Sequence, residues 1–279
     1  MTVDAIKNKL KSYSVNQRQN HQYTLTRFFQ ERFLFRLSKS PYIDRLLLKG
    51  GALVYVLGAR ESRFTKDIDF LLQRLQADED MIRTIFTKII QIEVDDGVSF
   101  TPESLRIEQI TKDSRYTGTR VRLEARLGNI KQGLQIDIGV GDHVTPGPQR
   151  IEYPTLLPDL GQPILQAYSL ETLIAEKFEA MISLGEFNTR FKDFYDLYLF
   201  VQQADQPMLV RAIHNTFERR KTVIAPNHPV FNKAFYTASA RVEQWQRFQR
   251  KNDLQPIPFT EVGARIHECL HHIYLQIRD

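Results

Sequence analysis

The sequence has few of the features that mark secreted, membrane-bound or repetitive proteins. Its single cysteine, Cys269, excludes an internal disulfide. No apolar run reaches the roughly 18 residues that a membrane-spanning helix needs. The first residues, Met-Thr-Val-Asp-Ala-Ile-Lys, lack the apolar core of a secretion signal, and there is no internal repeat. These absences predict a cytoplasmic protein with an ordinary folded core and no membrane partner.

Basic residues slightly outnumber acidic ones, and apolar residues are abundant. The 279 residues include 38 Lys and Arg against 33 Asp and Glu, a net charge of +5, and 42% of them are apolar. A chain of this length and composition can bury a large core and divide into two domains. The basic excess allows a polyanionic partner without requiring one.

Hydrophobic periodicity predicts a mixed region followed by a helical one. Apolar residues at helical spacing predict helices over residues 23–37 and 78–92, and strands are expected over residues 105–110, 120–127 and 134–140. The last of the mixed-region features is a proline-rich connection between residues 146 and 163. Further helices are expected over residues 169–184, 191–202, 208–220, 233–250 and 260–278.

These segments predict an α+β fold with an α/β core. In residues 120–127 apolar and charged side chains alternate, as in a sheet with one face covered by helices. We therefore predict a core domain with a mixed β-sheet and N-terminal helices over residues 1–160. A helical domain over residues 161–279 is expected to complete the active-site cleft.

The most informative stretch is a glycine turn followed by two carboxylates. A short apolar run ends at Lys49 and is followed by Gly50-Gly51 and a brief helix. Backbone N–H groups at such a turn can approach a phosphate at the helix N-terminus. Asp67 and Asp69 then alternate with apolar residues in a predicted strand, so both carboxylates share one face. Two such ligands suit Mg²⁺, and the stretch predicts a site for a metal ion and a nucleotide.

The spacing Asp-x-Asp is weak on its own, because Asp78-Glu79-Asp80 has it too. This second occurrence opens a predicted helix, whose dipole favours acidic residues without any metal. For the first occurrence, a half-buried strand with a solvated face is the simpler alternative. The neighbouring Arg63, Thr65 and Lys66 shift the balance toward a phosphate site, with a surface salt bridge, which contributes little stability, as the alternative.

A third carboxylate, Asp137, lies between Ile136 and Ile138 in a predicted strand, where an unpaired charge is costly. If this strand lies beside that of Asp67 and Asp69, Asp137 completes a three-carboxylate metal site and can help to deprotonate an attacking hydroxyl. In the alternative, Asp137 pairs with an arginine of the neighbouring strand.

Lys177 lies at the edge of the apolar stripe of the predicted helix 169–184, where lysine stems commonly snorkel to solvent. Asp193 falls near the start of the next predicted helix and could orient it. Lys177 is therefore a candidate for binding a triphosphate, with snorkelling as the alternative.

In order and spacing, residues 42–201 resemble the AbiEii/AbiGii-type, or MenT-like, nucleotidyltransferase toxins, which have a polymerase-beta-like core. The matching motifs are Lys49-Gly50-Gly51 with Thr65 and Asp67-x-Asp69, then Asp137, Ala175-Glu176-Lys177, and Arg190-Phe-Lys-Asp193-Phe-Tyr-Asp196. Lys192 stands where arginine is commoner in the family. The resemblance implies that the catalytic residues are Asp67, Asp69, Asp137, Lys177 and Asp193.

The resemblance also implies a reaction and partners. NMP is transferred from an NTP to an acceptor hydroxyl with release of pyrophosphate, and for characterised toxins the acceptor is a tRNA 3′ end. Growth arrest is relieved by a cognate antitoxin, and phage defence is the implied role. The implied metal is Mg²⁺, or Mn²⁺ in its place, on Asp67, Asp69 and Asp137. The expected nucleotide-binding residues are Lys49, Gly50, Gly51, Arg63, Thr65, Lys66 and Lys177, and all four NTPs stay open.

Three other functions fit parts of the sequence. The run His267-Glu268-Cys269-Leu270-His271 fits the zinc-hydrolase pattern His-Glu-x-x-His, but too little chain follows it for the usual downstream ligand. A small-molecule nucleotidyltransferase of the aminoglycoside type has the same pattern of a glycine turn followed by Asp-x-Asp. Its site needs an acidic pocket for a cationic acceptor, whereas this chain is basic. A non-catalytic nucleotide- or antitoxin-binding module has no need of the three carboxylates.

Overall fold

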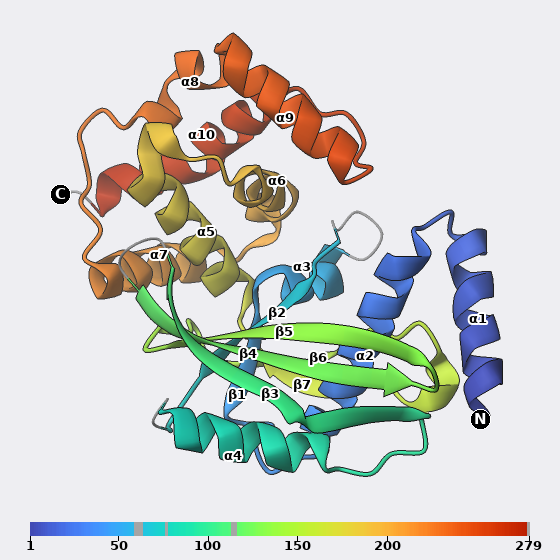
Figure 1. The fold of residues 1–279 in the computed structure, drawn as a ribbon. Coiled ribbons are helices and arrows are strands. Elements are labelled where there is room, and N and C mark those ends of the chain that lie inside the picture. Colours follow the sequence, from blue (N-terminus) through green and yellow to red (C-terminus); the bar gives the residue numbers. More distant parts are fainter. Residues whose placement is uncertain (59–63, 76–77, 113–115, 278–279) are drawn as a thin grey trace. The chain divides into compact units, whose positions relative to one another are not determined.

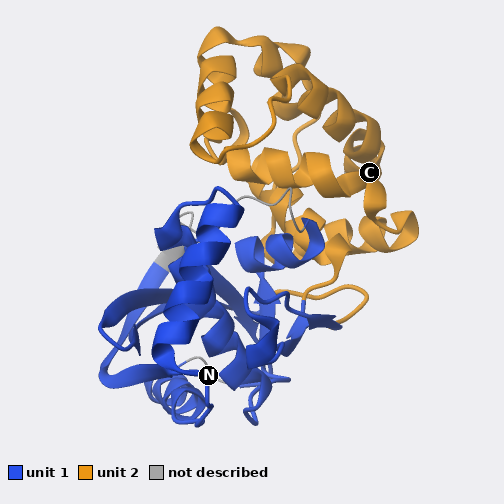
Figure 2. Cartoon of the chain, turned by 90° about the vertical axis from the view of Figure 1, so that its right-hand side faces the viewer, with its two compact units in different colours: residues 1–59, 64–141, 149–167 blue, residues 60–63, 142–148, 168–279 orange. Residues whose placement is uncertain are grey.

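A computed structural model describes residues 1–58, 64–75, 78–112 and 116–277 (Figure 1). Contacts divide the chain into two units (Figure 2). Unit 1 comprises residues 1–59, 64–141 and 149–167, and unit 2 comprises residues 60–63, 142–148 and 168–279. None of the described helices is long and apolar enough to cross a membrane.

Unit 1 is built on a mixed sheet whose strands follow the order β3-β4-β5-β2-β1-β7-β6. β2 pairs with β5, and β1 with β7, in parallel, and the other neighbours are antiparallel. The strands are β1 (Leu46–Lys49), β2 (Asp67–Leu72), β3 (Val98–Lys112), β4 (Tyr116–Leu127), β5 (Ile130–Val140), β6 (Gln149–Glu152) and β7 (Ile164–Ala167). The helices are α1 (Val3–Asn16), α2 (His21–Ser38), α3 (Gly50–Gly58) and α4 (Glu79–Ile90), with a 3-10 turn η2 (Pro158–Leu160).

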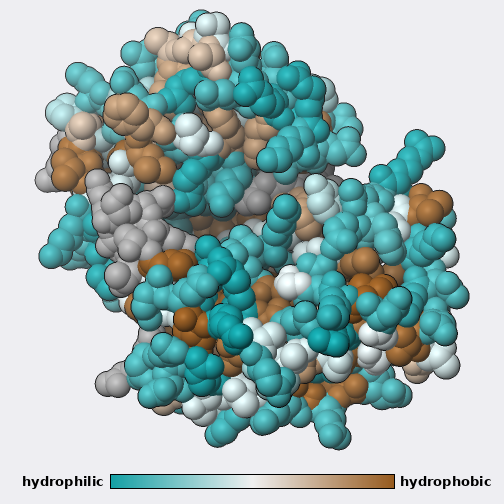
Figure 3. Space-filling model, in the orientation of Figure 1, coloured by the Kyte–Doolittle hydropathy of each residue, from teal (hydrophilic) through white to brown (hydrophobic). Residues whose placement is uncertain are grey.

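Aromatic packing joins α2 and α4 to one face of this sheet. The ring of Phe33 on α2 stacks 5.7 Å from Phe86 of α4 and meets Phe100 of β3 edge-on at 6.2 Å. The alternation predicted for β4 is confirmed, because Val121 is buried while Arg122 is exposed. The opposite face therefore keeps its polar side chains, and hydrophilic atoms cover much of unit 1 in the view of Figure 3.

The prediction of one long connection between the prolines was wrong in part. β6 and β7 lie within and just after it, and each has only four residues. A strand this short is well below the length at which alternation can be recognised. The pairing of β7 with β1 and β6 supplies the stabilisation that the local pattern does not show.

Unit 2 is helical, as predicted. Its helices are α5 (Leu170–Leu184), α6 (Phe191–Phe200), α7 (Gln206–Arg220), α8 (Lys233–Thr237), α9 (Ser239–Lys251) and α10 (Phe259–Gln276), with 3-10 turns η3 (Gly185–Phe187), η4 (Val201–Gln203) and η5 (Pro229–Phe231). The single helix expected over residues 233–250 was wrong. Ala238 adopts ψ 123°, which ends α8 and starts α9 in a new direction.

Aromatic rings fill the core of unit 2. Trp245 of α9 stacks on Phe259 of α10 with centroids 5.1 Å apart, and Phe259 meets Phe194 of α6 edge-on at 5.4 Å. Trp245 is buried, and its indole N–H donates to the carbonyl of Ile257 at 2.6 Å. These contacts hold α9 and α10 against α6, the helix that carries Asp193.

Candidate active site

Neighbouring strands of unit 1 bring three predicted residues side by side. The parallel register of β2 and β5 places Asp69 opposite Asp137, and the antiparallel register of β1 and β2 places Lys49 opposite Asp69. β4 adds Arg120 opposite Asp137. Because directly paired residues point to the same face, these four form a charged row across four strands.

Asp67 and Asp69 lie on β2 as their spacing predicts. The two residues are half-buried, and they alternate with the buried Ile68 and Phe70. Core packing of the apolar pair therefore fixes the face on which the two carboxylates lie.

Asp137 is buried and forms a bidentate ion pair. Arg120 donates from Nε to Oδ1 of Asp137 at 2.8 Å and from a terminal nitrogen to Oδ2 at 3.0 Å. These hydrogen bonds raise the pKa of the Arg120 guanidinium, and the charge of Asp67 adds to the effect. The strand of Asp137 lies beside that of Asp69, which a three-carboxylate site requires. Asp137 also pairs with an arginine of the neighbouring strand, as the alternative interpretation expects.

The side chains of Asp69 and Thr65 occupy the space beside the two glycines of the turn. Gly50 has φ +63°, and a Cβ there would lie 2.2 Å from Oδ2 of Asp69. A Cβ on Gly51 would lie 2.6 Å from the hydroxyl oxygen of Thr65, which donates to the carbonyl of Asp67 at 3.1 Å. No larger residue fits at either position without displacing Asp69 or Thr65.

Two of the predicted cations, Lys49 and Lys66, lie in different environments. Lys49 reaches across the sheet, because its Nζ lies 3.9 Å from where a Cβ on Gly139 of β5 would stand. Lys66 is exposed, and its carbonyl accepts from the side chain of Gln30 at 2.9 Å. Arg63 lies outside the described residues.

The carboxylates of β2 have the donor chemistry of a magnesium site. Oxygen ligands from one or two carboxylates are what Mg²⁺ takes from a protein, and Mn²⁺ accepts the same ligands. Within the described part of the chain, no three His, Cys, Asp or Glu side chains are gathered closely enough to hold a metal ion. Asp67 and Asp69 therefore fit such an ion as a pair, while Asp137 has both oxygens on Arg120.

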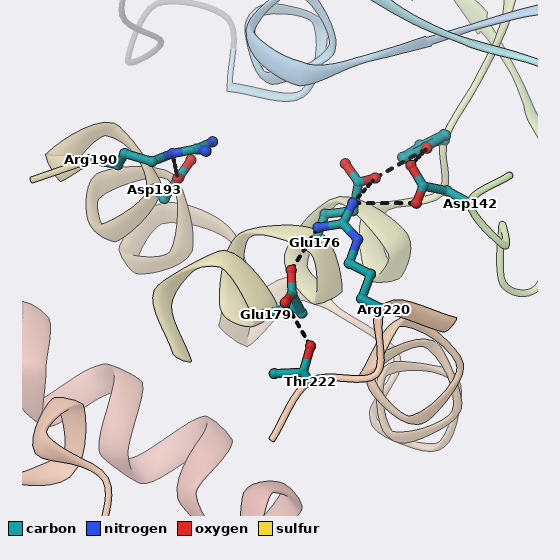
Figure 4. A network of polar contacts seen from close by, with 8 residues as sticks. Asp142, Glu176, Glu179, Arg190, Asp193, Arg220 and Thr222 are labelled. Atoms are coloured by element: carbon teal, nitrogen blue, oxygen red, sulfur yellow. Dashed lines mark hydrogen bonds and ion pairs between the residues drawn. The ribbon is translucent and has the colours of Figure 1, made fainter. Parts of the chain in front are cut away.

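In unit 2, α5 carries Lys177 into a cluster of ion pairs. Lys177 is buried, and its ammonium lies 3.1 Å from Asp193 and 2.6 Å from Asp196. Arg190 donates to the second oxygen of Asp193 at 2.7 Å (Figure 4). Asp193 thus contacts Lys177 directly, as an orienting residue would. The alternative in which Lys177 snorkels to solvent was wrong.

Asp193 is charged in this cluster in spite of its burial. Burial by itself raises the pKa of the carboxyl group, but Lys177, Arg190 and Lys192 more than offset this effect. The pKa of Asp193 therefore lies below its ordinary value. Lys177 therefore faces an ionised carboxylate at neutral pH.

A second polar network surrounds Arg220 at the end of α7 (Figure 4). Its guanidinium donates at 2.7 Å to both Glu176 and Glu179 of α5, and it lies 3.4 Å from Asp142. The hydroxyl of Tyr168 donates to Asp142 and Glu176, each at 3.3 Å. Burial by itself lowers the pKa of Arg220, but the three carboxylates raise it by a larger amount. The pKa of Arg220 therefore lies above its ordinary value. Arg220 thus fixes α5 on both sides of Lys177.

Sequence reasoning did not assign Arg120, Asp196, Arg190 or Arg220 to the site. The alternation of β4 could have indicated Arg120, because it lies on the polar face with other charged residues. Asp196 follows Asp193 by three residues, which places both on one face of α6. No local pattern marks Arg220, because its three carboxylate partners are far from it in the sequence.

Two competing motifs have structural explanations. The side chain of Asp78 accepts from the backbone N–H of Met81 at 2.8 Å and so caps α4, as expected for the second Asp-x-Asp occurrence. The rings of His267 and His271 lie 4.4 Å apart on α10, and His271 lies 4.7 Å from the ring of Phe231. The described residues offer this pair no third ligand.

Comparisons with known proteins show the family and the fold of this chain. Residues 32–265 match the family described as nucleotidyl transferase AbiEii toxin of a type IV toxin–antitoxin system. A candidate nucleotidyltransferase from H. pylori has a similar structure, with TM-score 0.53, 14% identity, and coverage of 92% of this chain and 97% of that chain. JHP933 from Helicobacter pylori gives TM-score 0.52 and 15% identity, with coverage of 92% and 94% respectively. At this identity the two structures show the fold alone, and no curated protein matches the sequence.

Proposed function

This chain belongs to the AbiEii family of nucleotidyltransferase toxins, and from this premise we propose that it transfers NMP from an NTP to a hydroxyl of an RNA, at a tRNA 3′ end. The observation that carries the proposal is the register that sets Asp69, two residues after Asp67 on β2, opposite Asp137. The net charge of +5 suits a polyanionic acceptor. The type IV toxin–antitoxin family implies an antitoxin partner.

The residues of unit 1 have distinct roles in this proposal. Asp67 and Asp69 would hold Mg²⁺ or Mn²⁺, and Asp137 would join them by exchanging Arg120 for the ion. When bound, the metal supplies positive charge that activates the acceptor hydroxyl and neutralises the triphosphate. Lys49 supports the proposal as a further cation for the phosphates, because its ammonium extends over β5.

Lys177 of unit 2 binds the triphosphate in the same proposal. Asp193 and Asp196 form ion pairs with its ammonium and restrict its position. A restricted cation loses less side-chain entropy when it binds a phosphate than a free lysine does. Lys177 therefore acts as a pre-positioned counter-charge for the leaving pyrophosphate.

The test uses NTPs labelled at the α-phosphate, each incubated separately with total RNA and with protein extract. We expect label in RNA with the wild type, and a loss of at least about a hundredfold with Asp69→Asn, because the substitution removes a carboxylate charge without changing side-chain size. Asp80→Asn is the matched control, since Asp80 has the same Asp-x-Asp spacing and is exposed in the first turn of α4. Chelation of divalent ions should abolish labelling, and Mg²⁺ or Mn²⁺ should restore it.

Two outcomes would contradict the proposal. Full labelling by a folded Asp69→Asn protein would remove the carboxylates from the reaction. Label that appears only in protein would replace the RNA acceptor by a protein one.

A further inference from the structure

An exposed aromatic pair lies at the edge of the proposed site in unit 1. The rings of Tyr23 and Phe64 are stacked with centroids 4.0 Å apart and an interplanar angle of 11°. Tyr23 lies in the first turn of α2 and is 40% exposed, and Phe64 is half-buried. Phe64 directly precedes Thr65, which touches the glycine turn.

The segment that carries Phe64 is fixed from two sides. The carbonyl of Lys66 accepts from Gln30, which lies two helical turns after Tyr23 on the same face of α2. On the other side, Thr65 packs on Gly51 and donates to the carbonyl of Asp67. α2 thus contacts this segment both through Tyr23 and through Gln30. These contacts fix Phe64, which precedes Asp67 of β2 by three residues.

Packing of the fold does not explain why the Tyr23 ring of this pair remains exposed. The aromatic pairs in the core of unit 1, such as Phe33 with Phe86, are fully buried. The tyrosine ring of the exposed pair instead leaves much of its surface in water, which forgoes part of the gain from burial. An exposed, parallel ring pair can accept a third flat ring, and single-stranded nucleic acids are commonly bound by stacking bases on such rings.

We propose that Tyr23 and Phe64 form a stacking platform for a nucleobase, either of the NTP or of the acceptor RNA. The inference rests on the proposed function, because it places the base beside the carboxylates of β2. The exposed Lys66 next to the platform supplies charge for a phosphate of the same nucleotide. Stacking is tolerant of base identity, so the platform contributes affinity more than base selection.

Equilibrium binding tests the platform with ligands that have or lack a base. The variants are Tyr23→Ala, Tyr23→Leu, which keeps apolar volume without a π-face, and Tyr23→Phe, which keeps the ring. We expect Tyr23→Ala and Tyr23→Leu to weaken binding of the stacked ligand by about 5- to 150-fold, while Tyr23→Phe stays near wild type. Inorganic tripolyphosphate, which has no base, should bind all of them equally. Phe187→Ala is the matched control, because Phe187 is 90% exposed and lies in unit 2.

The arms of the experiment distinguish the two sources of the base. Weaker NTP binding with unchanged RNA binding assigns the platform to the nucleotide, and the reverse assigns it to the acceptor. Unchanged affinity for both ligands overturns the proposal, and so does an equal loss of tripolyphosphate binding. A wild-type protein that binds NTP but transfers no NMP would contradict the proposed function and leave the stacking result valid.

Discussion

At the scale of single residues, charge compensation explains how two carboxylates can face each other on neighbouring strands. Like charges directly opposite each other in a sheet are destabilising. Asp69 and Asp137 form such a pair, and the register places a cation on each outer side, Lys49 next to Asp69 and Arg120 next to Asp137. The row therefore carries no net charge before any metal ion binds. A divalent ion bound by the carboxylates would have to compete with these two cations.

The lowered pKa of Asp193 makes its contribution to stability depend on pH. Because the folded pKa lies below the ordinary value of about 3.9, ionised Asp193 stabilises the fold above that value. We expect Asp193→Asn to lower the free energy of unfolding by on the order of 3 kcal/mol at neutral pH, because a buried ion pair loses one partner. The difference from wild type should shrink as the pH falls below about 4 and through the lower folded pKa.

Urea unfolding of both proteins between pH 3 and pH 7 measures this difference. Asp253→Asn is the control, because Asp253 is exposed in the same unit and its φ of +53° suits asparagine. A loss for Asp193→Asn that is equal at all pH values would show that its charge does not stabilise the fold.

The sequence predicted where single residues lie, but it did not identify the residues with which they pair. Period-two alternation placed Asp67 and Asp69 on one face, and the cost of a buried charge marked Asp137 as a residue with a partner. The choice of Arg120 as that partner depends on the register of β4 and β5, which local patterns do not determine. The sites remain predictions in their chemical roles, whereas their placement is now described for every one except Arg63.

At the scale of elements, the turn between β1 and α3 couples backbone conformation to the position of Asp69, a carboxylate of the proposed metal site. Gly50→Ala should strain the backbone at φ +63° and push its new Cβ against Oδ2 of Asp69. We expect a loss of roughly 1–3 kcal/mol in the free energy of unfolding and a large loss of NMP transfer. Gly133→Ala on β5 is the control, because no atom lies within 4 Å of the added Cβ.

Chemical denaturation and labelled-NTP transfer measure the two effects of Gly50→Ala separately. Activity equal to that of Gly133→Ala, in a protein that folds, would contradict the role of the turn in positioning Asp69.

Element prediction succeeded where a pattern extended over several turns or strand pairs. The predicted helix over residues 169–184 is confirmed as α5, and the Ser169 hydroxyl caps it by accepting from the backbone N–H of Thr172 at 3.2 Å. β6 and β7 were missed because their stability comes from pairing rather than from local alternation. The break at Ala238 was missed because alanine is the strongest helix former and gives no stop signal.

At the scale of the whole molecule, buried ion pairs are distributed between the two units. In unit 1, Arg36 makes a bidentate pair with Asp96 at 2.7 and 3.1 Å, and both side chains are buried. In unit 2, Arg220 forms ion pairs with Glu176, Glu179 and Asp142. Removing either arginine leaves carboxylates in a poorly solvated environment, which is more costly than losing a surface pair.

The single tryptophan, Trp245, makes the stability of unit 2 separately measurable, because it is buried in the aromatic core of that unit. We expect Arg220→Met to lower the urea midpoint of Trp245 fluorescence, with a loss of about 3–5 kcal/mol, because three carboxylates lose their shared cation. Arg36→Met is the matched substitution in unit 1 and should act mainly on the far-ultraviolet circular dichroism of the sheet. If both variants shift both signals equally, the units unfold as one cooperative block. A Trp245 midpoint that follows only Arg220→Met would instead establish unit 2 as a separate folding unit that carries Lys177.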